Sequence, residues 1–518
     1  MATAGKNHTI VSDFKNSVLV LAGMVGSIIL WFVSKIIIVR NTTKEELGLY
    51  SLSVAVAGIS SLISALGIPE GNSRYISIFF GEGRKDDAFA VSRASVGLGI
   101  VTAFSAGIIL FFFSGIVAEH FFYMPAIEAP LKIISIFVPF SVLTNVLIGV
   151  SRGFNIVRPR IYSETLQPLL FLVFISVIFI FRGPFRGVIY AYALAMIIVF
   201  LLIARVYGFA RFLINPVSLR HDAFAEQLLR FSMPLFMGGI TAIFMNWTDI
   251  VMLGRYMGAE SAAGYNIAMS LAKLLFFPIS AFEFAFMSVA GNLYARKQYA
   301  ELNRRYQVLT KWNFSATLPI FFILFFFPEM AIEFFFGRGY VDVAATTRIL
   351  SIGFLFHSFL GANGTIMMVL GASRAVMKIS MFSAVLNILM NYILIKHFHL
   401  GTGGAAVSTI TSYVVMNIIM SAMIYREKGI HPITPHYIKP ILSSAVIGLM
   451  IFALAKSLPL RLWMLPVYLT LYLAGYAVSL FATRSIEQED IDLINAISEK
   501  TGLDLERIKK FIYKGARS

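Results

Sequence analysis

Fourteen apolar stretches, each long enough or nearly long enough to cross a bilayer, follow one another along this chain of 518 residues. A spanning helix needs about 20 apolar residues, and in lipid every backbone N–H and C=O must be paired internally. Continuous apolar runs of this length indicate helices, so we predict an all-α membrane protein with 14 transmembrane helices. The stretches are residues 17–39, 47–66, 95–118, 133–150, 166–181, 187–204, 231–253, 262–290, 314–331, 349–370, 379–395, 403–424, 441–455 and 462–481.

The basic residues are distributed unevenly over the connecting loops. The two termini and the even-numbered loops hold 30 of the 43 Lys and Arg, whereas the odd-numbered loops hold 11. Basic loops favour the cytoplasmic side, so we expect a multi-pass plasma-membrane protein with both termini in the cytoplasm. The net charge of +16 is then a topology signal and an attraction to anionic lipids, and we expect no nucleic-acid partner.

Short motifs recur in the two halves of the chain. Gly48-Leu49-Tyr50 in the second stretch corresponds to Gly264-Tyr265 in the eighth, and Gly149 to Arg152 corresponds to Gly371 to Arg374. Six helices separate equivalent points, which predicts two six-helix lobes of the same orientation, as in parallel-repeat transporters. The expected divisions are an N-lobe at 17–209, a cytoplasmic linker at 210–230, a C-lobe at 231–424, two extra helices at 438–483 and a cytoplasmic amphipathic tail at 484–518.

Four charged residues stand out within the apolar stretches: Lys35, Asp249, Lys273 and Glu283. Glu329 lies at the outer end of the ninth stretch and can reach water. A charge at the bilayer centre costs about 2.5–3.5 kcal/mol on the insertion scale, so such residues usually face a cavity or a partner. Lys35 and Asp249 occupy nearly equivalent positions in the first helices of the two lobes. One alternative is that these two form a buried ion pair, while Lys273 and Glu283 extend to opposite surfaces.

A polar line runs along the eighth stretch, where Asn266, Lys273 and Ser280 recur every seven residues. On a helix of 3.6 residues per turn these positions share one face. Lys273 has about ten apolar positions on either side, so its amine cannot easily reach a surface and we expect it to face water, an acid or an anionic ligand.

Basic residues also gather where the fourth, fifth and tenth stretches meet the cytoplasm. They are either orientation charges or guanidinium groups that capture a phosphate headgroup. This proposed rim consists of Arg152, Arg158, Arg160 and Arg374, with Arg74 and Glu70 as further candidates.

Other intramembrane polar residues have a simpler interpretation. His357 could be a proton relay, but a lone histidine among Phe and Ser is more often a residue that contacts a neighbouring helix. Ser383, Asn387 and Asn391, at four-residue spacing in the eleventh stretch, are expected to hold helices together by hydrogen bonds. Cysteine is absent and no metal-ligand spacing is evident, so we expect no metal, no cofactor and no enzyme.

The chain resembles the multidrug/oligosaccharidyl-lipid/polysaccharide (MOP) exporter superfamily and, within it, the Wzx-type polysaccharide biosynthesis flippases. Residues 40–50 after the first stretch, Asp249 to Gly254 leading to Gly264-Tyr265, and residues 485–490 in the tail carry this resemblance. It implies a MATE-like fold with a cavity between two lobes, lined by the first, second, seventh and eighth helices. These helices carry Lys35, Asp249, Lys273 and Glu283.

The resemblance implies a flippase that exports a polyprenyl-(di)phosphate-linked oligosaccharide by alternating access. Coupling to H⁺ or Na⁺ would use Asp249 or Glu283. The expected partners are the lipid-linked oligosaccharide, anionic lipids and glycan-assembly enzymes at the cytoplasmic face, with the protein acting as a monomer. Two alternatives remain open: a MATE-like drug or cation antiporter, and an integral-membrane glycosyltransferase or polymerase.

Overall fold

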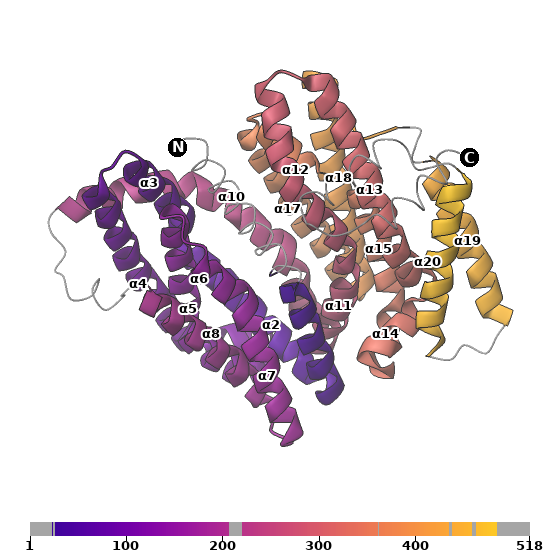
Figure 1. The fold of residues 1–518 in the computed structure, drawn as a ribbon. Coiled ribbons are helices and arrows are strands. Elements are labelled where there is room, and N and C mark those ends of the chain that lie inside the picture. The colour runs from indigo at the N-terminus through magenta and orange to yellow at the C-terminus, as the bar shows by residue number, and fades with distance from the viewer. Residues whose placement is uncertain are drawn as a thin grey trace. The chain divides into compact units, whose positions relative to one another are not determined.

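The structure is a computed structural model that describes residue 23 and residues 26–206, 220–360, 362–434, 438–457 and 463–483. The described residues form helices and connecting turns, with no β-strand among them (Figure 1). The cytoplasmic tail expected at 484–518 lies outside this part of the chain, as does the first half of the expected linker.

Eighteen α-helices of the described residues have assigned bounds, and residues 26–41 form a further helix before them. Their bounds are α2 (Lys44–Ala65), α3 (Ile68–Gly81), α4 (Lys85–Ile116), α5 (Glu128–Gly153), α6 (Arg158–Ile161), α7 (Gln167–Ile180), α8 (Arg186–Val206), α10 (Arg220–Met257), α11 (Ala259–Ala272), α12 (Phe277–Ala295), α13 (Tyr299–Phe326), α14 (Pro328–Phe336), α15 (Ala344–Leu360), α16 (Asn363–Val369), α17 (Ser373–Asn391), α18 (Gly401–Lys428), α19 (Ile438–Ser457) and α20 (Met464–Ala482). Short 3₁₀ or π turns extend or join several of them: η1 (Val117–Phe121), η2 (Pro125–Ile127), η3 (Tyr162–Leu166), η4 (Lys273–Phe276), η5 (Arg338–Val343) and η6 (Tyr392–His397).

Eleven helical segments within the described residues are long and apolar enough to cross a membrane. They correspond to the second to sixth and the eighth to thirteenth predicted stretches. The helix at 26–41, α10 and α20 occupy the first, seventh and fourteenth positions. The prediction of an all-α, multi-pass membrane protein is therefore confirmed. Some helices extend beyond the predicted apolar runs. Helix α4 begins ten residues earlier than predicted, and α10 includes residues 220–230.

A capping box starts α2, in the segment that carries part of the family resemblance. The Glu46 backbone N–H donates to Thr43 Oγ1 over 3.2 Å, and the Thr43 backbone N–H donates to Glu46 Oε2 over 2.9 Å. Two backbone donors at the end of the helix are thereby satisfied. The Thr43-to-Glu46 spacing therefore fixes where α2 begins.

Replacing Thr43 by alanine is expected to destabilise the protein by about 1 kcal/mol, the usual effect of losing such a cap. A lower apparent melting temperature of the purified protein would measure this change. The matched control is Thr411→Ala, because the exposed Thr411 hydroxyl only donates to Val407 O of its own helix. Equal melting temperatures for the two variants would contradict the prediction.

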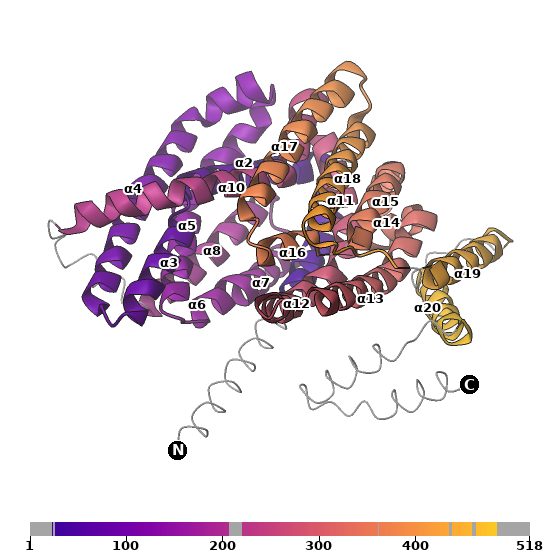
Figure 2. The ribbon, with the colours of Figure 1, turned by 90° about the horizontal axis from the view of Figure 1, so that it is seen from above.

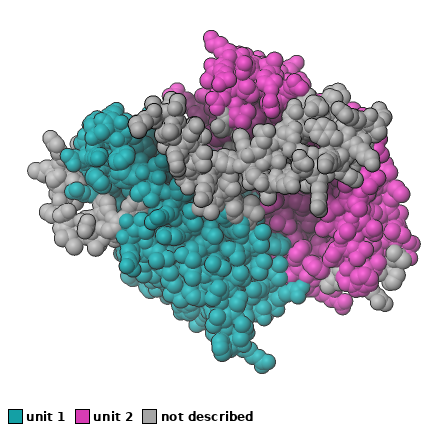
Figure 3. All heavy atoms as spheres, viewed as in Figure 1, with its two compact units in different colours: residues 1–266, 388–402 teal, residues 267–387, 403–518 magenta. Residues whose placement is uncertain are grey.

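The chain divides into two compact units, 1–266 with 388–402 and 267–387 with 403–518 (Figure 3). In the first unit α5 is central and contacts α2, α3, α4 and α8. Small residues allow this packing: a Cβ on Gly107 of α4 would lie 2.9 Å from Pro139 Cγ of α5. Close backbone approach through small residues is typical of membrane helices. The lobe boundaries predicted from the repeat stay a prediction.

In the second unit α13 packs against α15 and α19. The last two helices lie side by side in both views (Figures 1 and 2) and join α13 through aromatic rings. The rings of Phe322 and Tyr472 stack with centroids 4.2 Å apart, and those of Phe327 and Tyr468 with centroids 5.4 Å apart. Ser444 Oγ of α19 is hydrogen-bonded to the Tyr472 hydroxyl of α20 over 2.5 Å. The two C-terminal helices are therefore part of this unit.

Candidate functional site

The eighth predicted span is interrupted at Lys273. Helix α11 ends at Ala272, the 3₁₀ turn η4 covers Lys273–Phe276, and α12 begins with Phe277 and Pro278. Proline has no N–H to bond the carbonyl four residues earlier, which explains the tighter turn before it. The apolar run at 262–290 predicted one continuous helix, so the turn at Lys273 is a feature that the sequence pattern did not predict.

The polar line of this span is less buried than the other faces of the helix. Lys273 and Ser280 are exposed and Asn266 is half-buried. Residues on the other faces of the span are almost inaccessible, among them Leu271, Leu275 and Ile279, which are 0–3% exposed. Within the described residues, the Ser280 hydroxyl donates one hydrogen bond, to the Phe276 carbonyl of its own helix over 3.0 Å. Lys273 therefore lies on the least buried face of this span, and its predicted contact with water, an acid or an anionic ligand stays a prediction.

Aromatic side chains hold the interrupted segment in place within the second unit. The Phe276 ring lies 4.4 Å from the Phe354 ring and 5.0 Å from the His357 ring, centroid to centroid. Asn417 Nδ2 lies 2.8 Å from His357 Nδ1. His357 is therefore a helix-contact residue that supports the turn carrying Lys273, in agreement with the simpler of its two interpretations.

Asp249 lies in a polar cluster of the first unit and is 2% exposed. Its Oδ2 accepts a hydrogen bond from the Tyr265 hydroxyl over 2.6 Å, and its Oδ1 accepts one from Asn391 Nδ2 over 2.6 Å. Asn391 thus links helices α17 and α10, as its predicted role required. The repeat motif Gly264-Tyr265 gave no sign that the Tyr265 hydroxyl is a direct partner of Asp249.

Lys35 contacts the neighbouring position of α11. Its Nζ donates to the Asn266 backbone carbonyl over 3.4 Å and also to Asn266 Oδ1. Lys35 and Asp249 therefore each bind α11, through the adjacent residues Asn266 and Tyr265. The two positions predicted to be equivalent in the lobes both engage this one helix.

Glu283, the second acidic candidate, is half-buried on α12, where its Oε1 accepts a hydrogen bond from Thr365 Oγ1 over 3.2 Å. Thr365 belongs to α16, which follows a break in the tenth span after Leu360. The Tyr306 hydroxyl lies 2.7 Å from the Leu360 carbonyl and 2.6 Å from Asn363 Oδ1, so it bridges that break. Glu283 is therefore attached to a second interrupted helix of the same unit.

The predicted arginine rim has different surroundings at each position. The Arg74 guanidinium lies 4.5 Å from the Phe231 ring centroid, and Arg160 Nε pairs with Glu164 Oε1 over 2.7 Å. Arg158, at the start of α6, and Arg374, in the first turn of α17, are exposed. Arg152, in the last turn of α5, is exposed and borders a cavity.

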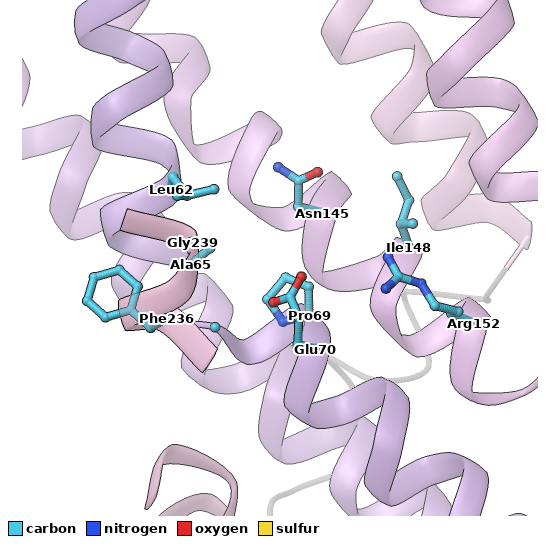
Figure 4. Close-up of a pocket in the computed structure, with 10 residues that line it drawn as sticks. Leu62, Ala65, Pro69, Glu70, Asn145, Ile148, Arg152, Phe236 and Gly239 are labelled. Atoms are coloured by element: carbon cyan, nitrogen blue, oxygen red, sulfur yellow. The ribbon is translucent and has the colours of Figure 1, made fainter. Parts of the chain in front are cut away.

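This cavity lies within the first unit and has a volume of about 330 Å³. Figure 4 shows Arg152 on one side of it and Phe236 on the other, with Glu70 and Asn145 between them. Helices α2, α3, α5 and α10 form its walls, through Leu62, Ala65, Gly67, Pro69, Glu70, Asn145, Ile148, Arg152, Phe236 and Gly239.

The cavity borders the turn at the end of the second predicted span, between α2 and α3. Leu66 and Gly67 have left-handed backbone conformations, with φ of 47° and 69°, and α3 starts anew at Ile68 with Pro69 in its first turn. A left-handed leucine is uncommon, and such residues concentrate at functional sites. The break between the two helices places Glu70 in the first turn of α3, at the wall of the cavity.

Comparison with known proteins identifies the family. A profile described as polysaccharide biosynthesis protein matches residues 14–282, more than half of the chain. The chain belongs to this family. A second profile, MatE, matches residues 234–393, and the chain is a multi-pass membrane transporter of the MOP superfamily.

Among curated proteins, stage V sporulation protein B of Bacillus subtilis (strain 168) is 21% identical over 434 residues, which cover 79% of this chain and 82% of that protein. The structure of lipid II flippase MurJ in an inward closed conformation matches with a TM-score of 0.72 at 13% identity, covering 89% of this chain and 98% of MurJ. An inward-facing multidrug resistance MATE family transporter of the MOP superfamily matches with a TM-score of 0.65 at 18% identity, covering 77% and 94%. These structures confirm the MATE-like fold of this family member.

Proposed function

We propose that the protein moves a polyprenyl-(di)phosphate-linked oligosaccharide across the membrane by alternating access, for the synthesis of a surface polysaccharide or glycan. The observation that carries this proposal is the position of Lys273, an exposed residue at the interruption of a membrane-spanning helix. Interrupted helices at membrane depth usually line a cavity rather than lipid.

The chemistry of the proposed substrate matches that position. A lysine facing lipid at this depth would be costly, whereas an ammonium in a wet cavity attracts a phosphate oxygen and donates charge-assisted hydrogen bonds to it. The Ser280 hydroxyl on the same face of the span adds a group that can bind a sugar hydroxyl. The polyprenyl chain has no polar atoms to satisfy and remains in the bilayer.

The open enzyme alternative receives less support from the described residues. A membrane glycosyltransferase or polymerase would need acid–base residues or a metal site on an extramembrane segment. The longest predicted outer segment contains the acids Glu333 and Asp342, with Glu329 beside it. Glu333 pairs with Arg338 over 2.6 Å, and Glu329 pairs with Arg348 over 3.2 Å. Carboxylates that form ion pairs of this kind are typical of a structural role. The matched families are also transporters.

Coupling to an H⁺ or Na⁺ gradient would use one of the two acidic candidates. Asp249 is the stronger candidate, because its buried carboxylate accepts hydrogen bonds from a tyrosine hydroxyl and an amide on two other helices. Glu283 is attached to only one hydroxyl, that of Thr365, among the hydrogen bonds described. Binding of a cation at Asp249 would change contacts that join α10, α11 and α17.

A flipping assay with the full chain tests this function. The protein is reconstituted in liposomes with a fluorescently labelled oligosaccharide on polyprenyl diphosphate, and a membrane-impermeant quencher measures how much label crosses. We expect faster crossing than in protein-free liposomes, and no crossing of the same labelled glycan on an uncharged diacylglycerol lipid.

The antiporter alternative is tested in the same vesicles with a fluorescent organic cation. The MatE match to residues 234–393 makes this the relevant competitor. Efflux of the cation without movement of the glycolipid would overturn the proposed function.

A further inference from the structure

We infer that the cavity between α2, α3, α5 and α10 is a subsite for the sugar-phosphate end of the transported lipid, in which Arg152 binds the phosphate and Glu70 with Asn145 binds the first sugar. This inference rests on the proposed function and adds the part of the substrate that is recognised.

Two opposite charges face this cavity without meeting each other. The side chains of Glu70 and Arg152 are both exposed, and within the described residues neither forms an ion pair or a hydrogen bond. The cavity therefore offers a donor fork and an acceptor carboxylate that are both available to a ligand.

The types of side chain fit a sugar phosphate. A guanidinium binds phosphate oxygens through parallel N–H bonds, and a carboxylate accepts hydrogen bonds from sugar hydroxyls. The Asn145 amide can donate and accept. Phe236, Ile148 and Leu62 supply apolar walls for the C–H faces of a sugar ring. Because Glu70 offsets Arg152, the cavity does not favour a simple organic cation or a bare anion.

The size is also suitable. Pockets for small organic ligands span about 300–1,000 Å³, and this cavity of about 330 Å³ lies at the lower end of that range. That volume suits a head of about one sugar and its phosphate. Further sugars of an oligosaccharide would extend beyond the cavity.

The packing of α3 against α5 keeps the two charges at fixed positions. Asn72 of α3 is 0% exposed, and its Nδ2 donates to the Val146 carbonyl of α5 over 3.1 Å. Gly149 permits this approach, because a Cβ there would collide with Pro69 O and Asn72 Oδ1. Glu70 and Asn145 therefore lie next to the fixed contact between α3 and α5, so ligand binding would require little movement of these helices.

A plainer interpretation is that each charge only stabilises its own helix. Glu70 lies in the first turn of α3 and Arg152 in the last turn of α5, where the helix dipole favours these signs. That interpretation predicts changes in stability without changes in binding. Measuring both quantities on the same variants separates the two.

The test measures binding to the purified full-length protein in an uncharged detergent, by ligand-observed NMR with three soluble probes. These are glucose 1-phosphate, inorganic phosphate and glucose. We expect millimolar binding of glucose 1-phosphate, at least tenfold tighter than binding of either fragment. Arg152→Gln should weaken glucose 1-phosphate binding at least tenfold, and Glu70→Gln should weaken it while leaving inorganic phosphate unchanged.

The matched controls are Lys132→Gln and Glu128→Gln, which alter an exposed ion pair at the other end of α5 and should leave binding unchanged. Unaltered binding of glucose 1-phosphate to Arg152→Gln and Glu70→Gln, with only their melting temperatures lowered, would overturn the inference. Equal weakening by the control variants would overturn it as well.

A competition experiment distinguishes the two membrane sources of a sugar-like phosphate. Nanodiscs that contain the polyprenyl-linked oligosaccharide should displace glucose 1-phosphate, and nanodiscs that contain phosphatidylinositol should not. Displacement by phosphatidylinositol alone would overturn the inference. Because no transport is measured, failure of the subsite and failure of the flipping assay appear as separate results.

Discussion

Replacing Lys273 by methionine is expected to slow glycolipid crossing by about two orders of magnitude while leaving insertion and folding intact. Methionine retains the length and apolar stem of the side chain but has no ammonium. A hydrogen bond to a charged group contributes about 1.5–3 kcal/mol, and about 1.4 kcal/mol corresponds to a factor of ten. Lys273 is an exposed residue, so the substitution does not alter the buried core of the unit.

Two variants sharpen this prediction. Lys273→Arg keeps the positive charge and should restore most of the rate. Lys396→Met makes the same substitution at another exposed lysine, whose amine is hydrogen-bonded to the Tyr392 hydroxyl over 2.9 Å. With this variant the glycolipid should cross at the normal rate. Normal crossing by Lys273→Met in the reconstituted assay would remove Lys273 from the proposed mechanism.

The position of Lys273 could be predicted from the sequence because a lysine within a long apolar run has few alternatives. The helix itself could not be predicted as well. Periodicity treats residues 262–290 as one helix, whereas the structure starts a new helix at Phe277. Pro278 was the available signal, since proline is favoured in the first turn of a helix and disfavoured in its interior.

The partners of the buried charges depend on packing between distant segments, which a single sequence does not show. Asn391 was predicted to bond between helices, but that its partner is Asp249 follows only from the approach of α17 to α10. Glu70 and Arg152 likewise meet one cavity because Asn72 fixes α3 on α5. The sequence grouped Glu70 with Arg152 as part of one proposed rim but did not indicate the cavity, and it gave no link between Asn391 and Asp249.

The second large effect is expected at Asp249. Asp249→Asn should fold and still move the glycolipid, but its rate should no longer respond to an imposed H⁺ or Na⁺ gradient. The substituted amide retains an oxygen for the Tyr265 hydroxyl, and Asn391 can turn its own amide to accept from the new N–H₂. The fold therefore tolerates the change, whereas the negative charge that would bind the coupling cation is lost.

Asp249→Ala is expected to be more disruptive, because it removes both 2.6 Å hydrogen bonds to the carboxylate. Each hydrogen bond to a charged group contributes about 1.5–3 kcal/mol, so this variant should lose about 3 kcal/mol of stability or more. Its melting temperature should fall well below that of Asp249→Asn. The difference between the two variants separates the structural role of the carboxylate from its proposed role in coupling.

Glu283→Gln decides between the two acidic candidates, and Glu260→Gln is the control, since Glu260 is an exposed residue in the first turn of α11. Each variant is assayed in liposomes with and without a gradient of one cation at a time. Loss of the gradient response in Glu283→Gln, with a normal response in Asp249→Asn, would assign ion coupling to Glu283 and its contact with Thr365 of α16. Loss only in Asp249→Asn would place it where Tyr265 and Asn391 join three helices, so that cation occupancy alters the packing of α10 directly.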